Sequence, residues 1–157
     1  MPGGASRSES VRAALELVET ADVVVHDAAR PLALPELFDN VVAELHRESA
    51  DGVVAAAPVT DTIKEVVRDR EISRTLDRSS LWAAQTPQAF RTEILRRALE
   101  ATGLISEATD DAMLVERIRD RIHGKVLVHP APAQNLKVTT PMDLRVAELA
   151  LAEREDH

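Results

Sequence analysis

The hydrophobic positions of this chain alternate between helical and extended patterns. After a polar loop at residues 1–7, apolar residues at i, i+3, i+4 and i+7 predict a helix with one buried face: Val11, Ala14, Leu15 and Val18. We expect Ser8-Glu9-Ser10 to cap it. The same spacing follows Pro35, which suits the first turn of a helix: Leu37, Val41, Val42 and Leu45. Two apolar runs, 23–26 and 53–59, predict strands, and the unbroken second run is typical of a strand covered on both faces.

A charged hairpin interrupts this alternation. Residues 63–67 and 71–75 flank a charged tip at 68–70 and contain few apolar side chains. Such an arm would be marginally stable alone in water, so we expect it to rest on a second subunit. The remaining pattern predicts four more elements: a helix at 91–101 closed by Thr102-Gly103, a helix opened by Thr109-Asp110-Asp111, a strand at 125–129 and a helix at 142–154.

Alternating helices and strands indicate one α/β domain over residues 1–157, with a mostly parallel sheet and helices on both faces. Doubly wound folds usually begin with a strand and a phosphate-binding turn. Because this chain begins with a glycine-containing loop and a helix, we expect the first βα unit of the fold to be missing.

The first strand ends at a group of residues with candidate chemistry, His26-Asp27-Ala28-Ala29-Arg30-Pro31. In open α/β sheets, ligands bind beyond the carboxyl ends of the strands. A carboxylate there can hold a metal ion, and an arginine three residues later can contact a phosphate. The segment therefore predicts a phosphate and metal site at the sheet edge. The alternative is that Asp27 only caps the strand end and that Arg30 is a solvated or ion-paired surface residue.

Composition narrows the class of partner. The formal net charge is −8, which argues against a nucleic-acid ligand but leaves room for a small phosphorylated one. The chain has no cysteine, so disulfides and thiolate metal sites are excluded. No apolar run is long enough to span a membrane, and no signal peptide is visible. We therefore expect a cytoplasmic protein.

The motifs together resemble the 2-C-methyl-D-erythritol 4-phosphate cytidylyltransferases, the CTP-dependent enzymes of non-mevalonate isoprenoid synthesis. Seven segments carry the resemblance in the same order: Gly3-Gly4…Arg7…Ser10-Val11, His26–Pro31, Pro58–Lys64, Thr75–Asp77-Arg78…Trp82, Gln85–Phe90, Thr109–Asp111 and Asn135–Leu144. The resemblance implies a Rossmann-like three-layer sandwich similar to nucleotide-diphospho-sugar transferases, with a protruding hairpin arm. It also implies transfer of CMP from CTP to methylerythritol phosphate, with release of pyrophosphate and Mg²⁺ or another divalent cation as cofactor.

The resemblance assigns roles near the sheet edge. Lys137 and Asp27 are the expected catalytic residues, and Asp27 is also the expected metal ligand and a nucleotide contact. Gly4 and Ser10 are expected to approach the cytidine. Where the family often has an acidic residue after the second glycine, this chain has Ala5. The structural alternatives are a helix cap for Ser10 and an ordinary surface lysine for Lys137.

Further expected substrate contacts are Arg30, Thr62, Arg78, Thr86 and Thr109. By resemblance, residues 62–78 form an arm that swaps across a homodimer, so that Thr62 and Arg78 complete the neighbour's substrate site. The alternatives are a merely solvated arm and threonines that serve turns and caps. Trp82 and Phe90 are expected in the core, and His26 is expected to be structural or solvated.

The family's opening glycine-rich loop, with its arginine and following lysine, has no counterpart in this sequence. We therefore expect weak or no cytidylyltransferase activity from this polypeptide alone. Two other functions stay open: a cytidylyltransferase for another sugar-alcohol phosphate, such as ribitol 5-phosphate, and a non-catalytic remnant that dimerises or binds ligand.

Overall fold

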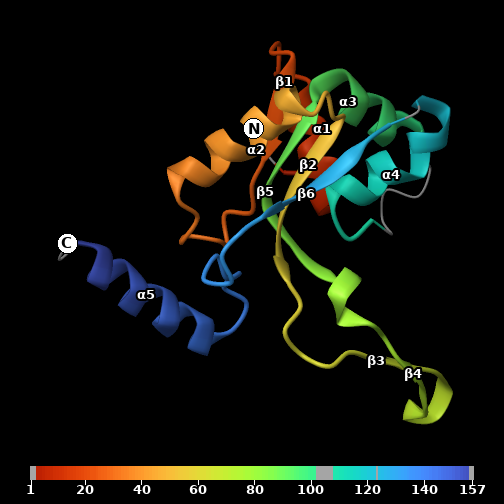
Figure 1. Ribbon diagram of the computed structural model, residues 1–157. Helices are drawn as coiled ribbons and strands as arrows, with labels where there is room; N and C mark the ends of the chain where they lie inside the picture. Colours follow the sequence, from red (N-terminus) through yellow and green to blue (C-terminus); the bar gives the residue numbers. More distant parts are fainter. Residues whose placement is uncertain (1–2, 102–107, 123, 156–157) are drawn as a thin grey trace.

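The computed structural model describes residues 3–101, 108–122 and 124–155 (Figure 1). Its central sheet has the strand order β1-β5-β2-β6. These strands are β1 (Asp22–Val25), β2 (Gly52–Pro58), β5 (Trp82–Arg91) and β6 (Val126–Pro130). β2 and β6 pair in parallel, whereas β5 pairs antiparallel with both β1 and β2. Three of the four strands therefore run in one direction, and the sheet is mixed.

β5 is the strand that the hydrophobic pattern did not predict. It is ten residues long and inserts between β1 and β2, although its sequence is rich in small and polar residues and contains Pro87 after a cis peptide bond. Its residues 85–90 are nevertheless all buried. Tertiary pairing on both edges places this segment in the sheet, because β-propensity depends strongly on neighbours.

The predicted helices are present with shifted ends, namely α1 (Arg7–Leu15), α2 (Pro35–Arg47), α3 (Thr92–Ala101), α4 (Asp111–Ile122) and α5 (Pro141–Glu155). α1 starts earlier than expected. Its cap is Ser6, whose hydroxyl accepts from the backbone of Glu9 while the Glu9 carboxylate accepts from the backbone of Ser6. The expected cap at Ser8-Glu9-Ser10 is therefore wrong by two residues. The expected closure of α3 at Thr102-Gly103 lies outside the described residues.

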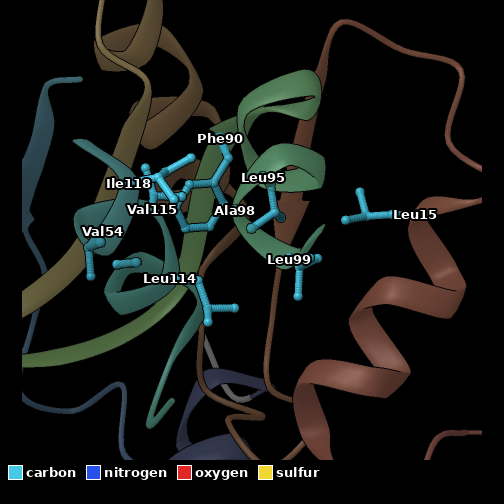
Figure 2. Packing of buried hydrophobic residues seen from close by; sticks show 10 residues of the cluster. Leu15, Val54, Phe90, Leu95, Ala98, Leu99, Leu114, Val115 and Ile118 are labelled. Atoms are coloured by element: carbon cyan, nitrogen blue, oxygen red, sulfur yellow. The ribbon is translucent and has the colours of Figure 1, made fainter. Parts of the chain in front are cut away.

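Two hydrophobic clusters give the sheet its three layers. α2 covers one face through this cluster: Leu37, Val41, Leu45, Ala50, Val53, Ala55, Ala89 and Ala131. α1, α3 and α4 cover the other face through this cluster: Leu15, Val54, Phe90, Leu95, Ala98, Leu99, Ala112, Leu114, Val115 and Ile118 (Figure 2). Burial of both faces explains why the β2 sequence is continuously apolar.

The two main aromatic residues have different environments. Phe90 is fully buried in the second cluster, as expected. Trp82 is 40% exposed, so the expectation of a core role is wrong for this residue. It is the first residue of β5, next to the arm, and pairs with Pro58 of β2.

The arm and the last helix project from this body (Figure 1). The arm is the separate two-stranded sheet β3 (Lys64–Val66) and β4 (Ile72–Thr75), with short 3₁₀ turns η1 (Arg68–Arg70) and η2 (Arg78–Ser80). Val66, Val67 and Ile72 are exposed on it. α5 also exposes much apolar surface, and its Arg154 donates to the Leu32 carbonyl. None of the described helices is both long enough and apolar enough to cross a lipid bilayer.

Candidate active site

β1 delivers Asp27 to the carboxyl end of the sheet. The carboxylate lies two residues beyond Val25, where the chain turns and the Arg30 N–H donates to the Asp27 carbonyl at 2.9 Å. The Asp27 N–H donates to Thr86 Oγ1 of β5 at 2.9 Å. His26 lies 3.0 Å from the same hydroxyl through Nδ1 and 3.2 Å from the Arg30 carbonyl through Nε2. His26 and Thr86 thus tie the turn to the sheet and fix the position of Asp27.

Three cations from separate segments surround this carboxylate. Arg7 of α1 places Nε 3.2 Å from Asp27 Oδ1, and Lys137 places Nζ 3.0 Å from Oδ2. Arg30 Nε lies 3.8 Å from Oδ2. Burial would raise the pKa of Asp27, but the hydrogen bond from Lys137 and the charge of Arg7 outweigh it and lower the pKa below its ordinary value. Asp27 is therefore ionised at neutral pH, and Arg30 and Lys137 converge on it as two of its counter-ions.

Lys137 reaches Asp27 because its loop is pinned on both sides. Asn135 is buried, and its Nδ2 donates to Gln85 Oε1 at 2.9 Å and to the Thr86 carbonyl at 2.8 Å. The Asn135 carbonyl accepts from Arg30 at 2.7 Å. On the other side, the N–H of Val138 donates to the Ala29 carbonyl at 2.7 Å. A surface loop is thereby held against β5 and the turn after β1.

Two hollows meet at this ion cluster. The first, of about 390 Å³, lies along α1 and β1 and is lined by Arg7, Ser10, Val11, Ala14, Val25, His26, Asp27, Ala28, Ala29 and Lys137. The second, of about 260 Å³, lies over β5 and is lined by Arg7, Asp27, Arg30, Ala84, Gln85, Thr86, Gln88, Thr109, Asp110 and Lys137. Arg7, Asp27 and Lys137 line both hollows, so the ion cluster forms their common wall.

The second hollow has a polar floor built on β5. Gln88 is buried, and its Nε2 donates to the Gln85 carbonyl at 3.1 Å and to Asp110 Oδ2 at 3.0 Å. Thr109 is exposed at the rim, where its hydroxyl lies 3.7 Å from the sulfur of Met113. Hydroxyl, amide and carboxylate groups beside Arg30 and Lys137 are suited to a small polyol that carries a phosphate.

Gly4 and Ser10 lie at the opening of α1. The Gly4 N–H donates to Ser10 Oγ at 2.9 Å, and that hydroxyl donates to the Ser6 carbonyl at 3.0 Å. A Cβ at Gly4 would lie 2.4 Å from Glu9 Cβ, so the close approach of the loop to the helix requires glycine. Ser10 is not the helix cap, because Ser6 fills that position.

Thr62 and Arg78 lie apart from the ion cluster. Both are exposed at the base of the arm, and neither lines either hollow. Arg78 donates to the carbonyl of Thr60. Within one chain, the structure does not bring these two side chains to Asp27.

Buried and partly buried polar residues complete the site, and hydrophobic periodicity gave no signal for them. Arg7 belongs to a motif but had no predicted role, and Asp110 and Asp111 were expected only to open a helix. Asp111 is fully buried, and its Oδ2 lies 2.7 Å from Arg7 Nη1. Burial raises the pKa of Asp111, while the charge of Arg7 opposes this shift. For the floor of the second hollow, the sequence signal would have been Gln85 and Gln88, two amide side chains three residues apart in the segment 85–90.

The described residues contain no cluster of three or more histidines or carboxylates that could hold a metal ion. Asp27 is the carboxylate shared by both hollows, and three cationic side chains surround it. One carboxylate is a fitting protein ligand for Mg²⁺ when phosphates and water supply the other oxygens. The donor set thus fits a cation that arrives with a nucleotide, and does not fit an all-protein metal site.

Comparisons with known proteins agree on one family. The family model described as 2-C-methyl-D-erythritol 4-phosphate cytidylyltransferase matches residues 1–153. Enzymes of that name from Parasynechococcus marenigrum and Rubrobacter xylanophilus are 49% and 47% identical over 98% and 97% of this chain, and over 66% and 65% of their own lengths. The crystal structure of the Thermus thermophilus enzyme superimposes with a TM-score of 0.82 at 34% identity, covering 98% of this chain and 72% of that one. The chain spans about two thirds of the length of these curated relatives.

Proposed function

The chain belongs to the 2-C-methyl-D-erythritol 4-phosphate cytidylyltransferase family, and we propose that it transfers CMP from CTP to methylerythritol phosphate. The observation that carries the proposal is the meeting of Arg7, Arg30 and Lys137 around Asp27, at the wall between two hollows. A reaction that joins two phosphate-bearing substrates requires cations at such a junction, with a binding volume on either side.

In this proposal, the first hollow takes the cytidine end of CTP and the second takes methylerythritol phosphate. Ser10 lines the first hollow and accepts from the Gly4 N–H, and Thr86 and Thr109 line the second hollow. A phosphate oxygen of the acceptor attacks the α-phosphorus of CTP. The bond from that phosphorus to the bridging oxygen breaks, and pyrophosphate leaves with both bonding electrons. No net proton transfer is needed, because a phosphate monoanion or dianion is already nucleophilic.

The protein's part in this chemistry is positioning and charge stabilisation. Lys137 and Arg30 hold the acceptor phosphate close to the reacting phosphorus, and Lys137 and Arg7 offset the negative charge that accumulates on the oxygens of that phosphorus. Asp27 keeps these cations in place and is the residue that would hold Mg²⁺. When bound, the metal ion would neutralise charge on the triphosphate.

We extend the proposal to a homodimer formed through the 62–78 arm. The arm projects from the body (Figure 1), and its Val66, Val67 and Ile72 are each more than half exposed. Thr62 and Arg78 do not reach the ion cluster of their own chain, so we assign them to the substrate site of a second copy. Arginine can bind a phosphate with two parallel hydrogen bonds, which suits that role. Because both proposed substrates are small phosphorylated metabolites, we place the protein in the cytoplasm.

The test is release of pyrophosphate from CTP in the presence of methylerythritol phosphate and Mg²⁺. Turnover should require all three components. Lys137→Ala should reduce kcat/KM by about 10²–10³-fold, the usual effect of removing a group that stabilises transition-state charge. Lys125→Ala is the matched control, since Lys125 is equally exposed and ion-paired, with Glu48, at the opposite end of the sheet. Equal activity of the two variants would contradict the assignment of Lys137.

Substrate choice is tested in the same assay. Ribitol 5-phosphate in place of methylerythritol phosphate should give a lower kcat/KM, and the reverse order would identify another acceptor. A chain that binds methylerythritol phosphate by calorimetry but releases no pyrophosphate would be a ligand-binding remnant. That result would refute the catalytic proposal and leave the assignment of the second hollow standing.

A further inference from the structure

Asp111 is a fully buried acidic residue that has no direct role in the proposed reaction. It is the first residue of α4 and is 0% exposed, and its Oδ2 lies 2.7 Å from Arg7 Nη1. Apart from this ion pair, neither oxygen has a hydrogen-bond partner among the described residues. A buried ionised carboxylate is costly, and replacing a buried ion pair by neutral residues is often harmless to stability. The fold alone therefore gives little reason for a charge at this position.

The consequence of the ion pair lies at its other end. Arg7 has a long side chain that is 32% exposed, and it lines both hollows. Its Nη1 is held by Asp111, while its Nε donates to Asp27 at 3.2 Å. Asp111 thus holds the Nη1 end of the planar guanidinium in the interior of the protein. This contact determines that the Nε–H edge of the guanidinium faces Asp27. The line of contacts runs from Asp111 through Arg7 and Asp27 to Lys137.

We propose that Asp111 is a positioning residue, which acts through Arg7 to hold the guanidinium between the two hollows with its Nε–H toward Asp27. The proposal rests on the proposed function, since it names the residue that orders the wall between the two substrates. Without the buried carboxylate, a partly exposed arginine has many rotamers and would turn toward solvent for much of the time. The helix N-terminus also favours an acidic residue, but that effect does not depend on Arg7.

The test compares three carboxylate variants. Asp111→Asn removes the charge with little change in shape, and Asp111→Glu keeps the charge. The control is Asp22→Asn, because Asp22 also forms a 2.8 Å ion pair with an arginine, Arg91, but at the opposite end of β1. The first measurement is the ¹H–¹⁵N NMR signal of the Arg7 Nε–H, whose linewidth and exchange rate report whether this group stays hydrogen-bonded. The second is kcat and KM for pyrophosphate release.

In Asp111→Asn, the Arg7 Nε–H signal should broaden or exchange rapidly, and kcat should fall about 10–100-fold, as for a misplaced catalytic group. Asp111→Glu should restore most of both. Asp22→Asn should leave both within twofold of the parent chain, even where it lowers the thermal midpoint. If Asp111→Asn keeps the Arg7 signal and kcat, or if Asp111→Glu is as impaired as Asp111→Asn, the positioning role is wrong.

Two outcomes need separate arms. If Asp111→Asn does not fold, Arg7→Lys takes its place, because lysine keeps the charge but cannot contact both carboxylates through a planar group. It should show the same fall in kcat, and normal turnover would overturn the proposal. If the parent chain releases no pyrophosphate, the proposed function fails, while the NMR comparison still decides whether Asp111 orders Arg7.

Discussion

Replacing Asn135 by alanine should destabilise the protein more than any surface change of the same type. The side chain is 1% exposed, and its Nδ2 makes two hydrogen bonds, to Gln85 Oε1 and to the Thr86 carbonyl. Alanine leaves both acceptors buried without a donor, and each orphaned group costs about 1–3 kcal/mol. Removal of Asn135 Oδ1, which is itself buried and unpartnered, offsets part of this cost. We expect a net loss of ~2–4 kcal/mol in the free energy of unfolding.

The measurement is urea denaturation of the parent chain, Asn135→Ala and the control Asn40→Ala. Asn40 lies on the exposed face of α2, so its substitution should change stability by no more than about 0.5 kcal/mol. The slope of free energy against urea should be the same in all three chains. For a chain of this length, the loss at position 135 corresponds to a fall of ~5–15 °C in the thermal midpoint.

A stability of Asn135→Ala within 0.5 kcal/mol of the parent would refute this reasoning. Such a result would mean that water or a relaxed loop satisfies Gln85 and Thr86 equally well. It would also remove the physical account of how Lys137 is held near Asp27. A large loss of stability with unchanged affinity for methylerythritol phosphate would show that Asn135 stabilises the fold but is not needed to position Lys137. The hydrogen bond of Val138 to Ala29 would then be the anchor that keeps Lys137 in place.

Three further outcomes are expected. Gly4→Ala should destabilise α1 by about 1–3 kcal/mol, because the added Cβ would overlap Glu9, and urea denaturation measures this; an unchanged midpoint would show that the loop can move away. Calorimetric titration with Mg²⁺ alone should show no binding, whereas Mg²⁺ together with CTP should bind, and Asp27→Asn should weaken the binding of Mg²⁺ with CTP. Tight binding of the metal ion alone would contradict a site with one carboxylate ligand. The double substitution Val66→Asp and Ile72→Asp should convert the proposed dimer into a monomer in sedimentation equilibrium, and a dimer that survives would place the interface elsewhere.

Local sequence patterns were sufficient to predict the elements whose buried faces are made of regularly spaced apolar residues. The apolar stripe predicted α2, because its residues form the one buried face of that helix. The continuous apolar run predicted β2, because both faces of that strand are buried. β5 was missed for the opposite reason. Its burial follows from pairing with β1 and β2, which are distant in sequence, and no local spacing encodes that.

The candidate site divides in the same way. Asp27 could be predicted because a strand that ends at a carboxylate is a local signal, and Arg30 follows in the same turn. Arg7 and Asp111 could not be assigned roles, since their contact joins α1 to α4 across about 100 residues of sequence. Ion pairs of this kind depend on the packed arrangement of helices, and only the three-dimensional structure supplies it.

The unequal numbers of charges at Asp27 have a consequence for the proposed binding of phosphate. Arg30 and Lys137 approach the same oxygen, Asp27 Oδ2, at 3.8 and 3.0 Å. Two cations that share one carboxylate oxygen retain positive charge, which would attract an incoming phosphate without requiring that Asp27 be displaced. Under the proposed function, this attraction should weaken as ionic strength rises, because salt screens partly exposed charges.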